Sequence, residues 1–348
     1  QGVLTFGQRS NAAYMLVNMA EHWRRTYDLA YGASIYAYAK EVIAFWEQYL
    51  VWESSRYKIV GDSVHEGSGT DVNPVQTLGL LRNALDLVID LSEELDQDAG
   101  KRVAWRHILE NLSGYTTQVR DGVEVFRYTE AGTAWWDDNT LGIQHIFPAG
   151  AVDHESEPSL VTCSRNTIDV MQRWYDFNGS NSIFPAAVRV GLDPRTILEK
   201  LRGYERRMAP NGFQRDNPHG IENLSTVPCT INEMLCMSQV ALGYAGPGGP
   251  CPPRAESMIR LFPVWPREQN ARFTRLRAWG GFLVSSSLRA GAVEFVELIS
   301  EQARDCTMRN PWSGQSARLY RNGKLSAVMS GTTFAFPTAR GEVIRLLP

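Results

Sequence analysis

The sequence is poor in cysteine and carries no marked excess of charge of either sign. Its 348 residues include five cysteines, an odd number, and no two of them stand as Cys-x-x-Cys. A disulfide scaffold is therefore not expected, and neither is a standard zinc site. The formal net charge is −3 at pH 7, which gives no electrostatic reason to predict nucleic acid or an anionic membrane surface as a partner.

Long apolar runs and several common catalytic motifs are missing as well. No stretch approaches the roughly 18 apolar residues that a membrane-spanning helix requires, and no secretory leader is recognisable. The sequence also lacks a Gly-x-Ser-x-Gly elbow, a P-loop and a Rossmann Gly-x-Gly-x-x-Gly pattern. The corresponding hydrolase and nucleotide-binding classes are therefore disfavoured.

Aromatic residues, in contrast, are well represented. They make up 10% of the sequence, and ten of them are tryptophan. Large aromatic side chains fill hydrophobic cores, and their flat faces also match the C–H face of a pyranose ring. Composition alone leaves both interpretations open. Trp135 and Trp136 are of special interest because they lie in a long loop within residues 113–162, and loops of that length in compact domains are often functional.

The first two-thirds of the sequence shows apolar residues at helical spacing. Asn73-Pro74, Asp193-Pro194 and Ser225 provide helix-start signals at three places. The predicted helices cover residues 9–30, 34–52, 73–96, 101–112, 163–177, 180–190, 194–208 and 225–243.

A change of period separates this helical part from the remainder. Residues 244–256 are rich in Pro and Gly and predict a linker. Beyond it apolar residues alternate, and Asn322-Gly323 predicts a hairpin turn, as Asp121-Gly122 does earlier in the chain. The sequence thus predicts a mainly α protein with a helical domain at residues 1–243, a linker at 244–256 and a small antiparallel β-sandwich domain at 257–348.

Three polar loops could carry chemistry. Glycoside hydrolysis needs a carboxylic acid that protonates the leaving oxygen and a carboxylate that activates water or attacks the sugar. Acids are concentrated in residues 61–71, 212–223 and 144–155, although ordinary loops and helix caps would account for them equally well. A metal site in the third loop would draw on His145, Asp153, His154 and Glu155. Their spacing matches no standard ligand pattern, so no metal is predicted.

The order of these segments resembles glycoside hydrolase family 95, the inverting α-L-fucosidases and their relatives, over most of residues 10–300. The pair Glu21-His22-Trp23 and Phe45-Trp46 looks like the helices that precede the acid loop of the family. Further similar segments are Ser63–Gly67, His145–Gly150, Phe213-Gln214, Ile231–Leu235, Arg260–Trp265 and Leu276–Phe282.

The resemblance implies an (α/α)6 toroid, here incomplete, with Glu66 as the general acid. Counting back from the shared Glu-Met-Leu places Glu222 at the general base, whereas counting forward from Phe-Gln places Asp216 there. We favour Glu222 because it adjoins the start of a helix and is followed by Asn223. The side chains expected to contact substrate are His65, Asp71, Trp135, Trp136, His145, Arg215, His219 and Asn223.

The implied activity is the inverting hydrolysis of terminal α-L-fucoside-like sugars from oligo- or polysaccharides, without a cofactor. The alternative is a non-catalytic carbohydrate-binding protein or a truncated structural remnant, because the N-terminal β-domain and first toroid helices of the family have no counterpart in this sequence. An incomplete toroid would leave an open apolar edge near the N-terminus, which predicts self-association or a missing N-terminal domain. A bacterial secreted or periplasmic location is favoured over the cytoplasm.

Overall fold

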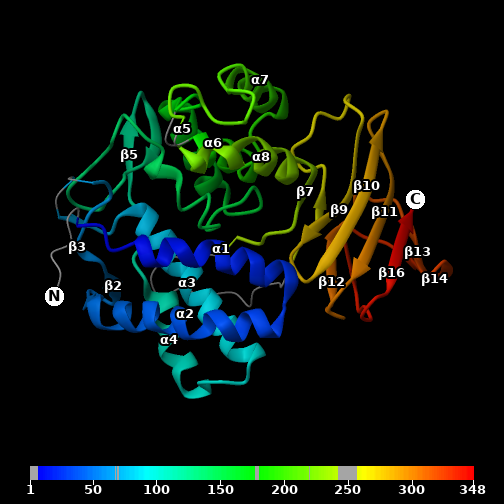
Figure 1. The fold of residues 1–348 in the computed structure, drawn as a ribbon, viewed down its shortest axis with the longest axis horizontal. Coiled ribbons are helices and arrows are strands. Elements are labelled where there is room, and N and C mark those ends of the chain that lie inside the picture. Colours follow the sequence, from blue (N-terminus) through cyan, green and yellow to red (C-terminus); the bar gives the residue numbers. More distant parts are fainter. Residues whose placement is uncertain (1–6, 67, 69, 177–179, 219, 242–256) are drawn as a thin grey trace.

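The computed structural model describes residues 7–66, 68, 70–176, 180–218, 220–241 and 257–348 (Figure 1). Helices occupy the first part of the chain and a strand-rich part follows. The α-helices are α1 (Asn11–Thr26), α2 (Leu29–Tyr49), α3 (Val75–Glu94), α4 (Arg102–Asn111), α5 (Pro158–Met171), α6 (Ser180–Arg189), α7 (Pro194–Glu205) and α8 (Thr226–Leu235). In the described part of the chain no helix is both long and apolar enough to cross a membrane.

Helix α3 is surrounded by α1, α2 and α4. This helix is buried on almost every side, and the apolar faces of α1, α2 and α4 lie against it in one continuous core. The break between α1 and α2 falls earlier than the sequence predicts. Tyr27 adopts a left-handed backbone conformation that ends α1, and the Asp28 carboxylate accepts hydrogen bonds from the amides of Ala30 and Tyr31, which starts α2.

The remaining four helices share a second core with the loops before them. The sequence predicts that α8 continues to residue 243, and this is wrong for Cys236 and Met237. These two residues form β7 (Cys236–Met237), which pairs in antiparallel fashion with β8 (Arg260–Leu261). Backbone pairing with a distant strand thus overrides the helical pattern that runs on in the sequence.

Short strands connect the helices. The predicted hairpin at Asp121-Gly122 is present as β5 (Thr117–Arg120) and β6 (Val123–Phe126), and both turn residues have positive φ, as a tight hairpin turn requires. Four other short strands are not predicted by the sequence pattern. They are β1 (Val51–Glu53), β2 (Arg56–Lys58), β3 (Val60–Asp62) and β4 (Asp71–Val72).

The C-terminal part contains a six-stranded antiparallel sheet in the order β14-β13-β16-β11-β10-β9. Its side chains share one core with the two-stranded sheet β12-β15, and the predicted hairpin turn at Asn322-Gly323 joins β13 to β14. The strands are β9 (Ala271–Ala278), β10 (Phe282–Arg289), β11 (Ala292–Ser300), β12 (Cys306–Arg309), β13 (Ala317–Arg321), β14 (Lys324–Met329), β15 (Thr333–Phe336) and β16 (Val343–Leu347).

The β9–β10 turn contacts the C-terminal end of α1. The amide of Gly280 donates a hydrogen bond to the carbonyl of Arg24 at 2.8 Å, and the Arg24 guanidinium lies 4.9 Å from the centre of the Trp279 ring. A second link is the ion pair between Arg304 and Glu94 at 2.8 Å. The helical and strand-rich parts are therefore in direct contact. Their division into separate domains remains a prediction, and the whole of the predicted linker, residues 244–256, lies outside the described residues.

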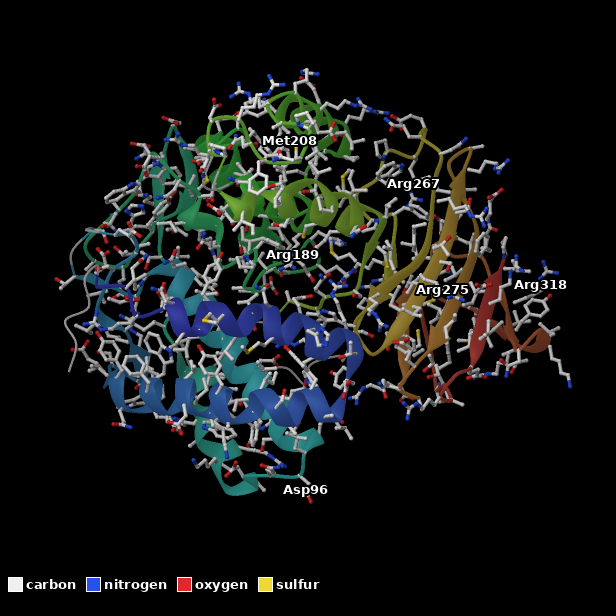
Figure 2. All side chains as sticks on the ribbon, in the orientation of Figure 1. Asp96, Arg189, Met208, Arg267, Arg275 and Arg318 are labelled. Carbon is white, nitrogen blue, oxygen red and sulfur yellow. The ribbon has the colours of Figure 1, made fainter. Side chains whose placement is uncertain are left out.

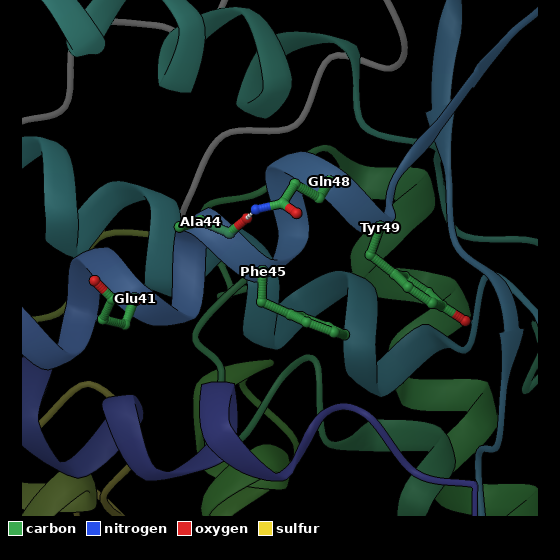
Figure 3. A pocket seen from close by; sticks show the side chains of 5 residues that line it. All are labelled: Glu41, Ala44, Phe45, Gln48 and Tyr49. Carbon is green, nitrogen blue, oxygen red and sulfur yellow. Dashed lines mark hydrogen bonds between the residues drawn. The ribbon is translucent and has the colours of Figure 1, made fainter. Parts of the chain in front are cut away.

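The outer face of α2 carries a shallow cavity of about 390 Å³ (Figure 3). The rings of Phe45 and Tyr49 stack at its edge with their centres 5.3 Å apart, and 45% of Phe45 is exposed. Glu41, Ala44 and Gln48 complete the lining. The open apolar edge predicted near the N-terminus and the predicted self-association remain predictions, which light scattering can test.

Candidate functional site

A cavity of about 740 Å³ lies between α1 and the segment formed by η3 (Ile221–Ser225) and α8. This volume is within the range of roughly 300–1,000 Å³ that is usual for small-molecule sites. Both apolar and charged groups line the cavity. Its apolar lining residues include Val17, Phe147, Pro148 and Leu224, and its charged lining residues are Glu21, Arg25, Arg189, Glu222 and Glu233.

Glu21 reaches the cavity from α1. Its Oε2 accepts hydrogen bonds from Nε of Arg25 at 3.0 Å and from the Trp279 indole at 3.2 Å. Burial by itself would raise the pKa of Glu21, but the positive charges of Arg25 and Arg189 and the bond from Trp279 outweigh it, so the pKa is lowered. Glu21 is therefore an ionised hydrogen-bond acceptor at neutral pH.

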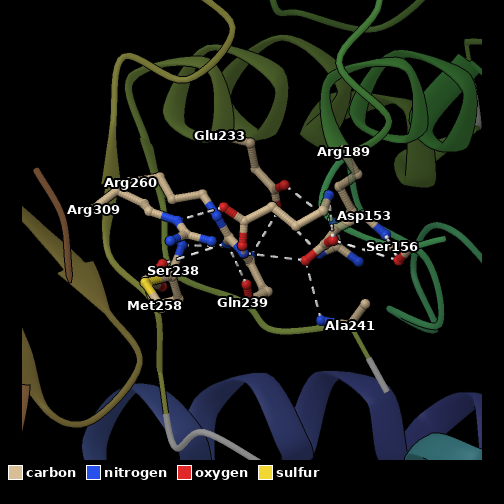
Figure 4. A network of polar contacts seen from close by, with 11 residues as sticks. Asp153, Ser156, Arg189, Glu233, Ser238, Gln239, Ala241, Met258, Arg260 and Arg309 are labelled. Atoms are coloured by element: carbon tan, nitrogen blue, oxygen red, sulfur yellow. Dashed lines mark hydrogen bonds and ion pairs between the residues drawn. The ribbon is translucent and has the colours of Figure 1, made fainter. Parts of the chain in front are cut away.

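Glu233 and Arg189 form a buried ion pair in the inner wall of the cavity (Figure 4). Arg189 donates to both carboxylate oxygens of Glu233, at 3.1 and 3.0 Å, and only 3% of its side chain is exposed. Burial opposes the charge of Arg189, but the carboxylate of Glu233 raises its pKa overall. Gln239 adds a third bond, from its side-chain amide to Glu233 Oε1 at 2.9 Å. The orientation of the Glu233 carboxylate is therefore fixed. Arg189 is labelled near the middle of the view in Figure 2.

The polar network extends from this pair toward the strand-rich part (Figure 4). Arg260 donates to the backbone carbonyl of Gln239 at 2.7 Å and to the carboxylates of Asp153 and Glu155 at 3.3 and 2.6 Å. Arg309 of β12 also donates to Glu155, at 2.7 Å. Although partial burial opposes ionisation, these two arginines lower the pKa of Glu155 to about 2. The network thus connects the cavity wall with β8 and β12.

Glu222 lies at the mouth of the cavity on η3 and is exposed. Tyr14 of α1 lines the same cavity, and its pKa is raised by burial and by the negative charge of Glu222. Tyr14 therefore keeps its proton and can donate a hydrogen bond. The next residue along the chain, Asn223, is fully buried, so its predicted contact with substrate is not supported by its position.

Ile221 of the 212–223 loop also lines the cavity, whereas Arg215 and Asp216 are not among its described lining residues. Both of these side chains are exposed. His219, a predicted substrate contact, lies outside the described residues. Of the two alternatives for the general base, the structure places Glu222 at the cavity and Asp216 away from it.

Glu66 lies in a different loop and is exposed. It is not among the described residues that line the cavity of Glu222. Its neighbour His65 stacks on Trp136 with ring centres 4.5 Å apart. Trp135 lies against Tyr128, with ring centres 5.0 Å apart. The structure therefore brings His65 together with Trp136, but it does not bring Glu66 into the lining that includes Glu222.

Asp71 and His145 are buried, so their positions give no support to the prediction that they contact substrate. Asp71 accepts hydrogen bonds from the amides of Val64 and Thr133 and from the Ser68 hydroxyl, and it thereby fixes the loop around it. His145 is packed against Tyr115, Phe126 and α3. A Cβ atom at Gly79 of that helix would come within 2.6 Å of the His145 side chain.

No group of three or more His, Cys, Asp or Glu side chains among the described residues is arranged to hold a metal ion. In the 144–155 loop, Asp153 and Glu155 are bound by Arg260 instead. Their carboxylates are therefore engaged in the network of Figure 4.

The sequence patterns do not predict a role in the site for Glu21, Arg189 or Glu233. Glu21 and Arg25 have the spacing of an ion pair on one helix face, a signal that was available in the sequence. Glu233 was used only as a landmark in the Glu-Met-Leu segment. The partnership of Arg189 with Glu233 joins α6 to α8, and no local pattern reports such a contact.

No protein-family model and no curated protein matches the chain. Solved structures that match include a Streptomyces avermitilis α-L-rhamnosidase complexed with L-rhamnose, at a TM-score of 0.45 and 10% identity, covering 94% of this chain and 32% of that chain. Another is a GH127 β-L-arabinofuranosidase from Geobacillus stearothermophilus T6, at a TM-score of 0.22 and 12% identity, covering 79% of this chain and 42% of that chain. Both neighbours are glycoside hydrolases, and this chain spans less than half the length of either. Likeness at these scores establishes neither the toroid nor membership of family 95.

Proposed function

We propose that this chain binds a carbohydrate in the cavity between α1 and α8. The observation that carries the proposal is the composition of the wall, in which the carboxylates of Glu21, Glu222 and Glu233 occur together with apolar side chains. Ionised carboxylates accept hydrogen bonds from sugar hydroxyls, and apolar groups pack on the C–H faces of the ring. Few convergent polar groups in a mostly apolar concavity are typical of small-molecule sites.

Hydrolysis is the second candidate function, and the position of Glu222 favours it. Glu222 is the residue that the resemblance to family 95 implies as general base, and it reaches the cavity from a loop at a helix start. In the inverting reaction it would remove a proton from water as the water attacks the anomeric carbon. Glu66 would protonate the leaving oxygen, which requires the two carboxyl groups to come within roughly 6.5–9.5 Å of each other. The substrate would be a terminal α-L-fucoside-like sugar.

The replacement Glu222→Gln tests both candidate functions, carbohydrate binding and hydrolysis. Glu222 accepts hydrogen bonds as a carboxylate, and an amide replaces part of that capacity with donors, so we expect about tenfold weaker binding of the sugar that a glycan array identifies. If the chain hydrolyses aryl α-L-fucosides or other aryl glycosides, turnover should fall by about 10²–10⁴ because no carboxylate remains to activate water. Isothermal titration calorimetry and release of the aryl group measure the two effects.

The matched control is Asp216→Asn, the same chemical change in the neighbouring loop but outside the cavity lining. It should leave sugar affinity and turnover close to wild type. Loss of binding in Asp216→Asn with normal binding in Glu222→Gln would move the site to the 212–218 loop. If Glu66→Gln and Glu222→Gln both bind sugar and neither the wild type nor any variant releases the aryl group, the carbohydrate-binding version stands and the hydrolytic version is rejected.

A further inference from the structure

Two donors hold the same oxygen of the Glu21 carboxylate. Nε of Arg25 donates to Oε2 at 3.0 Å, and the indole of Trp279 donates to that atom at 3.2 Å. The other oxygen, Oε1, has no hydrogen-bond partner within the described part of the chain. The side chain of Glu21 lines the cavity between α1 and α8 and is 25% exposed. The carboxylate thus offers one free, oriented acceptor to a ligand.

The C-terminal sheet holds both donors in place. Nη1 of Arg25 donates to the backbone carbonyl of Arg277 in β9. Trp279 directly follows that strand, and its backbone amide donates to the Ser238 hydroxyl at 2.9 Å. Only 4% of Trp279 is exposed, and a buried indole N–H usually requires a hydrogen-bond partner. The direction of the Glu21 carboxylate is therefore set from β9 and the turn after it.

The charge of Glu21 defines what Oε1 can bind. Burial alone would raise the pKa of Glu21, but the guanidinium groups of Arg25 and Arg189 outweigh burial and lower it. An ionised carboxylate accepts hydrogen bonds and donates none, and a bond to a charged acceptor is stronger than a bond between neutral groups. Oε1 therefore favours a ligand group that carries a proton donor over one that offers only lone pairs.

We propose that Trp279 is a positioning residue of the carbohydrate site, which holds the Glu21 carboxylate so that Oε1 accepts a hydrogen bond from one particular hydroxyl group of the sugar. The proposal rests on the proposed function, because the cavity between α1 and α8 must bind the sugar. Trp279 is not among the described residues that line this cavity, so it acts through Glu21. The C-terminal sheet would thereby determine which hydroxyl the sugar must carry.

The experiment compares methyl α-L-fucopyranoside with its monodeoxy analogues, each of which lacks one hydroxyl. If only another sugar binds on a glycan array, that sugar and its monodeoxy analogues are used instead. One analogue should bind wild type about tenfold more weakly than the parent sugar, because Glu21 has lost its donor. In Glu21→Gln the charged acceptor is gone, and the penalty for this analogue should fall to about twofold. Isothermal titration calorimetry measures both.

Trp279→Phe removes the indole N–H and should weaken binding of the parent sugar by about threefold to tenfold. In the Glu21→Gln background the same replacement should change the affinity by less than about twofold, because the group through which Trp279 acts is no longer a carboxylate. Trp312→Phe is the matched control. Trp312 is buried in the C-terminal part too, its indole donates to the Val293 carbonyl at 2.8 Å, and it is not among the described lining residues. This control should keep the wild-type affinity.

The pH dependence of binding distinguishes positioning from a general loss of structure. The bond from Trp279 helps to lower the pKa of Glu21, so its removal raises that pKa. Binding requires the ionised carboxylate and should therefore decline at a higher pH in Trp279→Phe than in wild type and Trp312→Phe. The other charged and titratable groups around Glu21 are the same in all three proteins; they are Arg24, Arg25, Arg189, Glu222, Cys229 and Glu233.

If Trp279→Phe does not fold, benzothienylalanine in place of Trp279 keeps the size of the ring, replaces the N–H with sulfur and should give the same changes. Wild-type affinity in the variant without the N–H overturns the inference. So does an equal loss in the Glu21→Gln background, or a set of analogues whose penalties all survive Glu21→Gln. Sugar binding that still depends on Glu222 then leaves the proposed function standing. The absence of binding to every sugar on the array rejects the proposed function together with the inference.

Discussion

Replacing Arg189 by Met is expected to lower the free energy of unfolding by about 3–5 kcal/mol, because it leaves the buried carboxylate of Glu233 without its counter-ion. Arg189 and Glu233 are 3% and 6% exposed, so water cannot replace the lost interaction without a rearrangement. Arg189 also donates to the carbonyl of Ile146 at 3.1 Å, a bond that Met cannot make. Urea denaturation monitored by tryptophan fluorescence measures the change.

Two further variants distinguish the effect of the unpaired buried charge on stability from the effect of losing the contacts of the Arg189 side chain. Arg195→Met breaks an exposed pair with Glu268 and should cost no more than about 1 kcal/mol. The double replacement Arg189→Met with Glu233→Gln removes both charges and should recover a large part of the loss. The loss of unfolding free energy in the double variant is compared with the sum of the losses in Arg189→Met and Glu233→Gln. If the two are equal, the unpaired charge is not the cause.

Acidification from pH 7 to pH 5 should destabilise the chain by about 2 kcal/mol through His145 alone. Burial, and secondarily the charge of Arg82, lowers the pKa of His145 from 6.5 to about 3. Below pH 6.5 His145 therefore takes up a proton in the unfolded chain but not in the folded chain. The stability of the folded chain falls until the pH nears 3. The pKa of His154 is lowered too and acts in the same direction. Glu155 has a pKa of about 2 in the folded chain. It therefore adds a similar loss of stability only when the pH falls below its ordinary pKa of 4.5.

The replacement His145→Leu isolates the part of the acid-induced loss of stability that comes from His145. Neither imidazole nitrogen has a hydrogen-bond partner within the described part of the chain, so an apolar side chain of similar length forfeits no such bond there. Thermal denaturation at pH 8 and pH 5 should show a smaller acid-induced drop in the variant than in wild type. His22→Gln, at an exposed position on α1, is the matched control. Equal slopes for wild type and His145→Leu would show that His145 is not the acid-sensitive group.

Local patterns in the sequence were sufficient for much of the secondary structure. Apolar spacing predicted helices in all the segments where α1 to α8 occur, and the Asn-Gly and Asp-Gly turns predicted two hairpins correctly. The failures have a common physical origin, which is competition from distant partners. Cys236 and Met237 follow a helical pattern, yet they pair with Arg260 and Leu261.

The candidate site was predictable only in part, for the same reason. Glu222 reaches a cavity, and the resemblance to a known family was what singled it out. His145 carries the right chemistry for a sugar contact, but its burial depends on Gly79 and Phe126, which are far away in the sequence. Glu21 and Glu233 were overlooked because each lies on a helix whose acids also suit a solvated face. Packing between helices decides which face of a helix lines a cavity. No short motif in a single sequence reports this packing.

The hydrogen bond from the Gly280 amide to the Arg24 carbonyl makes the β9–β10 turn a cap for α1. The last turn of any helix leaves several carbonyls without partners, and here the sheet supplies one of the missing donors. Glu21 and Arg25 lie in the final turns of this helix, so fraying from its C-terminal end would dissolve one wall of the binding cavity. If the cavity binds a ligand as proposed, the affinity would depend on how firmly the sheet holds the end of α1. Slow amide hydrogen exchange in the last turn of α1 should report how firmly the sheet is seated.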